Sequence, residues 1–152
     1  MSRAVTVELC QPVAAPASVV WDAVVDWPTQ QQWMLGTTVA VTSGDGRSVG
    51  STLSAYSGRR PFGFVDTMTI TGWDPPRCCV VSHTGKVVRG KGIFTVQPAG
   101  AGASTFRWRE ELVLPLGVLG ALGWPVARPA FVAGVRYSLR RFAAVCADRA
   151  RG

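Results

Sequence analysis

The feature that most constrains the fold is a series of short β-type segments between residues 36 and 114. These segments are rich in Val, Thr, Ile and aromatic residues, and clusters of Gly, Pro, Ser and Asp separate them. The separating turn signals lie at residues 43–46, 57–58, 74–76, 84–85 and 98–102. About six strands at this spacing predict an antiparallel meander.

Two of the predicted strands alternate clearly between an apolar and a polar face. In the segment 105–113, one face carries Phe106, Trp108 and Leu112, and charged residues dominate the other. In the segment 62–70, four apolar side chains share one face: Phe62, Phe64, Met68 and Ile70. Such alternation predicts strands that bury one face against a core.

Before the meander, the sequence predicts one strand and two short helices. Residues 4–10 alternate as a strand that ends at Pro12. A helix follows from Pro16 to Pro28, because proline suits a first helical position and apolar residues recur at helical spacing. The residues on its apolar face are Val20, Val24 and Trp27. A second short helix is expected at residues 30–34, after a capping-box sequence.

After the meander, one long amphipathic helix is predicted from Pro125 or Pro129 to Ala150. Its apolar stripe consists of Phe131, Val132, Val135, Leu139, Phe142, Ala143 and Cys146. The opposite side carries Arg136, Arg140, Arg141 and Arg151. The Gly-rich residues 116–123 match no phosphate-binding pattern, and we interpret them as a mobile apolar flap.

Together these elements predict a cavity inside one domain. A strongly twisted sheet curls, and a single helix laid across its concave face cannot fill the whole curve. No internal repeat or low-complexity linker indicates a second domain, so residues 1–152 are expected to form a single one.

The composition excludes several classes of protein. Only 16% of the residues are charged and 47% are hydrophobic, which argues against a disordered chain or a coiled coil. The net charge is +7. This charge is either a by-product of GC-rich coding or a means of attracting anionic lipid, nucleic acid or an acidic ligand. No block of five like charges occurs, which argues against a nucleic-acid-binding tail.

Cysteine and histidine usage predicts no metal site and no cofactor. The four cysteines show no C-x-x-C spacing, and His83 is the only histidine. The N-terminus has no apolar stretch of signal-peptide length, which favours a cytoplasmic protein with free thiols. Residues 112–127 carry no charge, but they are broken by proline and glycine and are too short for a membrane span.

Two segments of the sequence resemble a known family. The segments VAAPASVVWDAVVDWPTQQQW (residues 13–33) and GKGIFTVQPAGAGASTFRWREELVLPLGVLG (residues 90–120) are similar to the polyketide cyclase/dehydrase group. That group belongs to the SRPBCC superfamily, which also includes START lipid-transfer domains and the birch-pollen allergen type. The resemblance covers essentially the whole chain. It implies an α+β helix-grip fold, in which a curved antiparallel sheet of about seven strands wraps around a long C-terminal helix, with two short helices after the first strand.

Four polar residues are candidates for chemistry in the cavity. Asp66 and Glu110 each lie between two apolar residues of their strand face, so both should point inward. They are either a ligand anchor or acid–base pair, or structural groups that are solvated or paired near strand ends. His83 would titrate near neutrality, but both faces of its strand look similar and neither His83 nor Tyr56 can be placed.

The apolar candidates for ligand binding are Trp33, Met68, Phe94, Trp108, Phe131, Val135 and Leu139, which could equally be ordinary core residues. The leading functional hypothesis is a carrier or receptor for a hydrophobic, lipid- or polyketide-like small molecule. The alternative is a cyclase, aromatase or dehydratase that uses the polar residues of the same cavity. A third hypothesis is weak contact with anionic membranes through Arg136 and Arg140, whereas nucleic-acid binding is disfavoured. The oligomeric state is left open.

Overall fold

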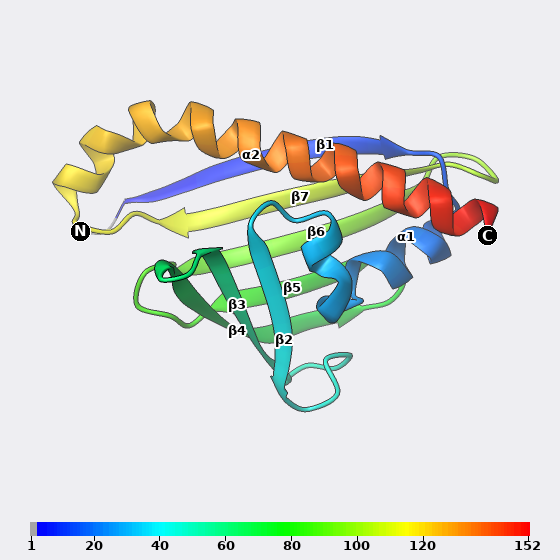
Figure 1. Cartoon of the computed structure of the whole chain (residues 1–152), viewed down its shortest axis with the longest axis horizontal. Coiled ribbons are helices and arrows are strands. Elements are labelled where there is room, and N and C mark those ends of the chain that lie inside the picture. The colour runs from blue at the N-terminus through cyan, green and yellow to red at the C-terminus, as the bar shows by residue number, and fades with distance from the viewer. Residues whose placement is uncertain (1–2) are drawn as a thin grey trace.

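Seven strands form one antiparallel sheet in the order β1-β7-β6-β5-β4-β3-β2 (Figure 1). The computed structural model describes residues 3–152. The strands are β1 (Ala4–Val13), β2 (Thr37–Ser43), β3 (Thr52–Arg59), β4 (Phe62–Asp74), β5 (Cys78–His83), β6 (Gly90–Pro98) and β7 (Ser104–Val113). The helices are α1 (Ala17–Val24), the 3₁₀ helix η1 (Trp27–Gln32) and α2 (Val118–Arg151).

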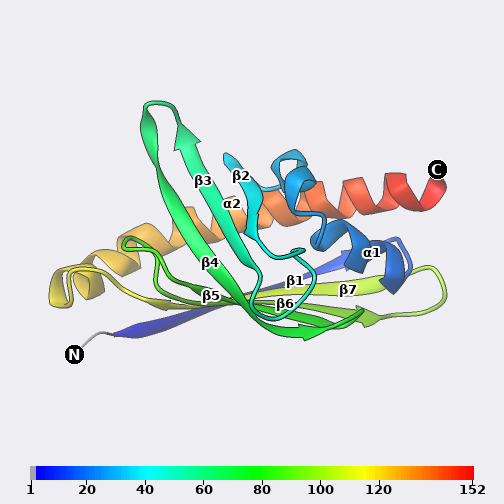
Figure 2. The ribbon, with the colours of Figure 1, turned by 90° about the horizontal axis from the view of Figure 1, so that it is seen from below.

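The sheet topology confirms the predicted meander. Strands β2 to β7 follow one another as hydrogen-bonded neighbours, and β1 pairs with β7 at the opposite edge. The sheet is curved, and α2 runs along it (Figure 2). The ring of Phe142 on α2 lies 4.7 Å from that of Phe106 on β7 and 4.7 Å from that of Trp33. The helix therefore contributes directly to the core above the sheet.

The first strand is longer than predicted, because Pro12 does not end it. Strand β1 continues to Val13, and Pro12 pairs in register with Thr105 of β7. Proline cannot donate a backbone hydrogen bond, but an edge strand has one side without a partner strand. The expectation that Pro12 stops the strand is wrong for that reason.

The two short helices also have different bounds from those predicted. Helix α1 ends at Val24 rather than at Pro28, and Trp27 opens the 3₁₀ helix η1 instead of closing α1. The second helix therefore spans Trp27–Gln32 rather than residues 30–34. Pro28 lies in its first turn, where the fixed φ of proline fits and its missing N–H has no helical partner to lose.

The long helix begins at Val118, so residues 118–123 are its first turns and not a flap. Pro125 and Pro129 both lie inside the helix. Each removes one intrahelical hydrogen bond, but this half of α2 is exposed (Val126 is 83% exposed), so water can reach the freed carbonyl groups. By length and composition α2 is apolar enough to cross a membrane, a test that the core helix of a soluble protein also passes.

The second half of α2 buries the predicted apolar stripe. Val135, Leu139, Phe142 and Cys146 are buried in the core. The predicted apolar face of β4 is only partly buried, since Met68 and Ile70 are buried whereas Phe62 is 85% and Phe64 38% exposed. Both phenylalanines lie near the β3–β4 turn, where that strand begins.

Candidate functional site

A cavity of about 350 Å³ lies between the inner face of the sheet, η1 and the middle of α2. Its lining is mostly apolar. Five of the residues predicted to bind a ligand line it, namely Met68, Phe94, Trp108, Phe131 and Val135. A cavity of this size falls within the range of small-molecule sites in proteins.

Trp33 and Leu139, the other two predicted ligand contacts, lie in the core and do not line the cavity. Each is 1% exposed. The indole of Trp33 packs against Phe142 at 4.7 Å and edge-on against Trp108 at 6.1 Å between ring centroids. These two side chains support the cavity wall from behind rather than form its surface.

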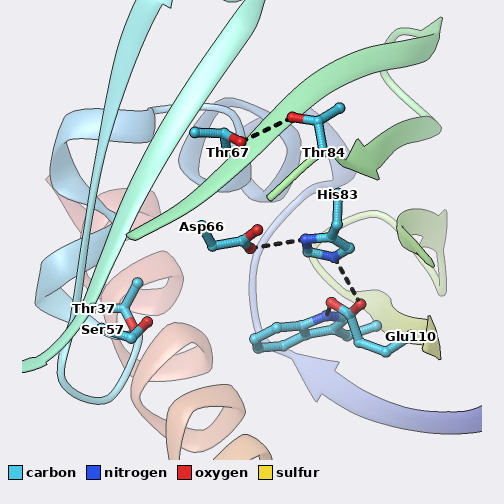
Figure 3. A network of polar contacts seen from close by, with 8 residues as sticks. Thr37, Ser57, Asp66, Thr67, His83, Thr84 and Glu110 are labelled. Carbon is cyan, nitrogen blue, oxygen red and sulfur yellow. Dashed lines mark hydrogen bonds and ion pairs between the residues drawn. The ribbon is translucent and has the colours of Figure 1, made fainter. Parts of the chain in front are cut away.

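One polar cluster interrupts the apolar lining, and His83 is at its centre (Figure 3). Its Nδ1 lies 2.8 Å from Oδ2 of Asp66, and its Nε2 lies 3.2 Å from Oε2 of Glu110. The three side chains are only 8–11% exposed. Sequence alternation predicts the inward direction of both carboxylates, and the structure brings them to the same imidazole.

The register of four strands produces this cluster. Asp66 on β4 and His83 on β5 are brought together because His83 pairs with Met68, two residues beyond Asp66. Glu110 lies on β7 and must reach across β6, where its register partner is Gly92. A Cβ atom at Gly92 would lie 3.1 Å from Oε1 of Glu110. The missing side chain at Gly92 thus leaves the space that the carboxylate occupies.

Burial and the neighbouring charges have opposite effects on the pKa of His83. Burial lowers the pKa of its imidazole, but hydrogen bonds to Asp66 and Glu110 and the attraction of their negative charges raise it by more. The resulting pKa is about 9, against an ordinary value of 6.5. At neutral pH the ring is therefore an imidazolium that donates Nδ1–H to Asp66 and Nε2–H to Glu110.

Each carboxylate has a further property that matters for a ligand. Glu110 accepts a second hydrogen bond, from the indole Nε1 of Trp108 at 2.6 Å, which fixes its orientation. The other oxygen of Asp66, Oδ1, is buried and has no hydrogen-bond partner within residues 3–152. An unpaired buried acceptor is costly to the folded state. Among residues 3–152, no group of three or more metal-ligating side chains is arranged to hold a metal ion.

Comparison with known families identifies the chain. A family model described as polyketide cyclase/dehydrase and lipid transport matches residues 4–147. The chain belongs to this polyketide cyclase/dehydrase family. A comparison with curated protein sequences found no match.

Solved structures share the fold of this polyketide cyclase/dehydrase family member. The Zhui aromatase/cyclase of Streptomyces sp. R1128 superimposes with a TM-score of 0.78 at 15% identity, covering 97% of this chain and 96% of that one. A polyketide-cyclase-like protein of Corynebacterium glutamicum gives a TM-score of 0.67 at 19% identity, covering 95% and 93%. Norcoclaurine synthase of Thalictrum flavum, in complex with dopamine and hydroxybenzaldehyde, gives a TM-score of 0.65 at 17% identity, covering 91% of this chain and 85% of that one. At these identities the similarity establishes the helix-grip fold alone.

Tyr56, the fourth polar candidate, is separate from the cavity of this family member. Its neighbours Ala55 and Ser57 both line the cavity, so the alternation of β3 directs Tyr56 to the opposite face. There the guanidinium of Arg60 lies 5.5 Å from the centre of its ring.

Sequence reasoning missed four polar residues that line the cavity, one of which is Ser138 on α2. Thr37 and Ser57 are joined by a hydrogen bond of 2.9 Å between their hydroxyls (Figure 3), and the buried amide of Gln30 donates to the Val24 carbonyl at 2.8 Å. The position of Ser57 on the same strand face as Leu53 and Ala55 was the one available signal. Thr37 and Gln30 reach the cavity only through the packing of η1 and β2 on the sheet.

Proposed function

We propose that this protein binds a hydrophobic small molecule that carries at least one polar group. The observation behind the proposal is an apolar cavity whose lining is interrupted by the Asp66–His83–Glu110 cluster. Apolar walls supply most of the binding free energy, and a few polar groups set the orientation of a ligand. Its apolar part would lie against Met68 and Phe131, with a hydroxyl or amine facing the Asp66–His83–Glu110 cluster.

Within this proposal the protein acts as a carrier or receptor for a lipid- or polyketide-like compound. Native mass spectrometry of the freshly purified protein, followed by organic extraction, tests it directly. We expect an adduct whose extracted compound is apolar and oxygen- or nitrogen-bearing.

A cavity-filling variant makes the binding test specific. Gly134 lines the cavity, and a Cβ there would meet only Leu35 Cδ2, at 3.8 Å. Gly134→Phe should therefore occupy the space without a backbone clash and abolish the adduct. Ala144→Phe adds the same side chain at an exposed position of the same helix and should leave the adduct unchanged. Equal retention of the compound by both variants would contradict binding in this cavity.

The second candidate is an enzyme of the cyclase, aromatase or dehydratase type, and the charged His83 between two carboxylates favours it. Asp66 would take a proton from the carbon beside a ketone, and the enolate would attack a second carbonyl of the same molecule. His83 would donate a proton to the new alkoxide, and the proton on Asp66 would restore the imidazolium. Loss of water in a second step would leave a carbon–carbon double bond. The arrangement supplies one acid and one base within hydrogen-bond distance of each other.

Two conservative variants separate these functions. Asp66→Asn and Glu110→Gln keep the shape of the side chains while they remove the charges. A carrier should keep its affinity for the extracted compound within a few-fold in both variants. An enzyme should still bind a poly-ketone substrate but lose turnover by roughly 10²-fold or more, the usual contribution of a general acid or base.

A further inference from the structure

Exposed apolar side chains are concentrated at one end of the molecule. Nine of the thirteen exposed large apolar residues among the described positions lie in three segments. They are Phe62, Phe64, Val65, Val87, Leu116, Val118, Leu119, Leu122 and Val126. Eight of them are more than half exposed, between 52% and 85%. Contiguous exposed apolar surface of this kind marks an interaction site more often than ordinary solvent-facing surface.

The three segments lie at the same end of the fold. They are the β3–β4 turn, the β5–β6 loop and the start of α2. All three lie on the left in Figure 1; in Figure 2 the β5–β6 loop and the start of α2 lie on the left, and the β3–β4 turn stands at the top, left of the centre. Phe64, Val88 and Ala130, one from each region, line the cavity together. Val87 and Trp124 line a second hollow of about 350 Å³ beneath the start of α2. We name this surface, formed by residues 59–65, 84–89 and 114–130, the apolar end.

The apolar end is also strongly basic. Its exposed cations are Arg59, Arg60, Lys86, Arg89 and Arg128. None of them takes part in an ion pair within residues 3–152. The three segments contain no Asp or Glu. The surface therefore combines unpaired positive charge with exposed apolar side chains.

We propose that the apolar end docks on the surface of an anionic lipid bilayer. Such a surface accepts apolar side chains at the boundary of its acyl chains and offers negative headgroups to the flanking cations. A second copy of the chain fits less well, because a two-fold interface would set the five cations against five more. The helix lies on the bilayer rather than spanning it, since the second half of α2 is packed into the core.

The charge pattern separates this surface from the arginines noted in the sequence. Arg136 and Arg140 lie in the second half of α2, outside the apolar end, where Tyr137 is the one exposed large apolar residue among residues 135–151. Charge without apolar contact gives weaker and more salt-sensitive binding. Docking at the apolar end does not depend on what the cavity binds, so the two proposals can fail separately.

Flotation of the full chain with vesicles tests the proposal. We expect binding to phosphatidylcholine vesicles that contain phosphatidylglycerol and much weaker binding to phosphatidylcholine alone. The double variant Arg60→Ser/Arg128→Ser should lower the affinity about 30-fold, because each basic residue near an anionic surface contributes about 1 kcal/mol. Leu119→Ser/Leu122→Ser should lower it on both kinds of vesicle. All four side chains are exposed, so the fold should not change.

The matched control is Arg136→Ser/Arg140→Ser, which removes the same charge from the same helix and should leave binding within a few-fold of the original. An equal loss in this control would mean diffuse electrostatic attraction and would overturn the proposal. So would a concentration-dependent dimer by light scattering that is abolished by Leu119→Ser/Leu122→Ser while no vesicle binding is detected.

Discussion

The pKa of His83 is the most direct test of the polar cluster, because the chain has one histidine and its imidazole signals in an NMR titration are unambiguous. The structure gives a pKa of about 9, produced by Asp66 and Glu110 against the effect of burial. Removing one negative charge leaves less opposition to burial, which lowers the pKa of His83. We expect both Asp66→Asn and Glu110→Gln to lower the pKa of His83.

The same shift makes folding stability depend on pH. The folded pKa of His83 is raised above its unfolded value, so its contribution is fully present below pH 6.5 and is lost as the pH rises through about 9. At about 1.36 kcal/mol per pH unit, the difference between 6.5 and about 9 corresponds to about 3 kcal/mol. Because the side chain of His83 is only 8% exposed, solvent screening lowers this contribution only slightly.

Urea unfolding at several pH values from 6 to 9 measures this contribution. Between pH 6 and 8 the free energy of unfolding should fall in the original chain, fall less in Glu110→Gln and be nearly flat in His83→Gln. Above pH 8 the buried thiols of Cys79 and Cys146 add a fall of their own, because burial raises the pKa of each to about 12 whereas a thiol of the unfolded chain ionises near 9. An imidazole that titrates at or below 6.5, or a flat profile in the original chain, would refute the assignment of His83 as an imidazolium at neutral pH.

Three further predictions concern the residues that position the site. Gly92→Val should displace the Glu110 carboxylate and lower the pKa of His83 in an NMR titration; an unchanged pKa would contradict the role of the gap at Gly92. Phe142→Ala should lower the free energy of urea unfolding by about 3–5 kcal/mol, the usual cost of an emptied aromatic site, and a loss under 1 kcal/mol would mean that the core does not depend on it. Ser138→Ala removes the hydroxyl that accepts from the Leu35 amide at 3.0 Å, which should cost about 1 kcal/mol in the same assay and speed hydrogen exchange at that amide.

The fold was largely predictable because its signals are local. Alternation in 105–113 and turn residues between the strands are read over fewer than a dozen positions, and they place six strands in order. The same alternation directs Asp66 and Glu110 inward. Helix bounds were less predictable at prolines, since Pro125 and Pro129 are tolerated only because the first half of α2 is exposed, a fact of tertiary structure.

The centre of the candidate site was beyond local reasoning. His83 lies on a short strand whose two faces carry similar residues, so periodicity could not orient it. Its partners are 17 and 27 residues away and come from two other strands. Gly90 and Gly92 leave one face of β6 without side chains, but only the register shows that the carboxylate of Glu110 occupies the space at Gly92.

The pairing of β1 with β7 has a consequence for synthesis on the ribosome. Strand β1 emerges first, yet its one neighbouring strand consists of residues 104–113, near the end of the chain. Until those residues leave the exit tunnel, β1 cannot join the sheet, whereas β2 to β6 can already pair with one another. Pairing between such distant segments is slow, and the waiting strand is exposed to other chains meanwhile. Nascent chains arrested before residue 104 should therefore expose β1 to proteolysis even after β2 to β6 have formed.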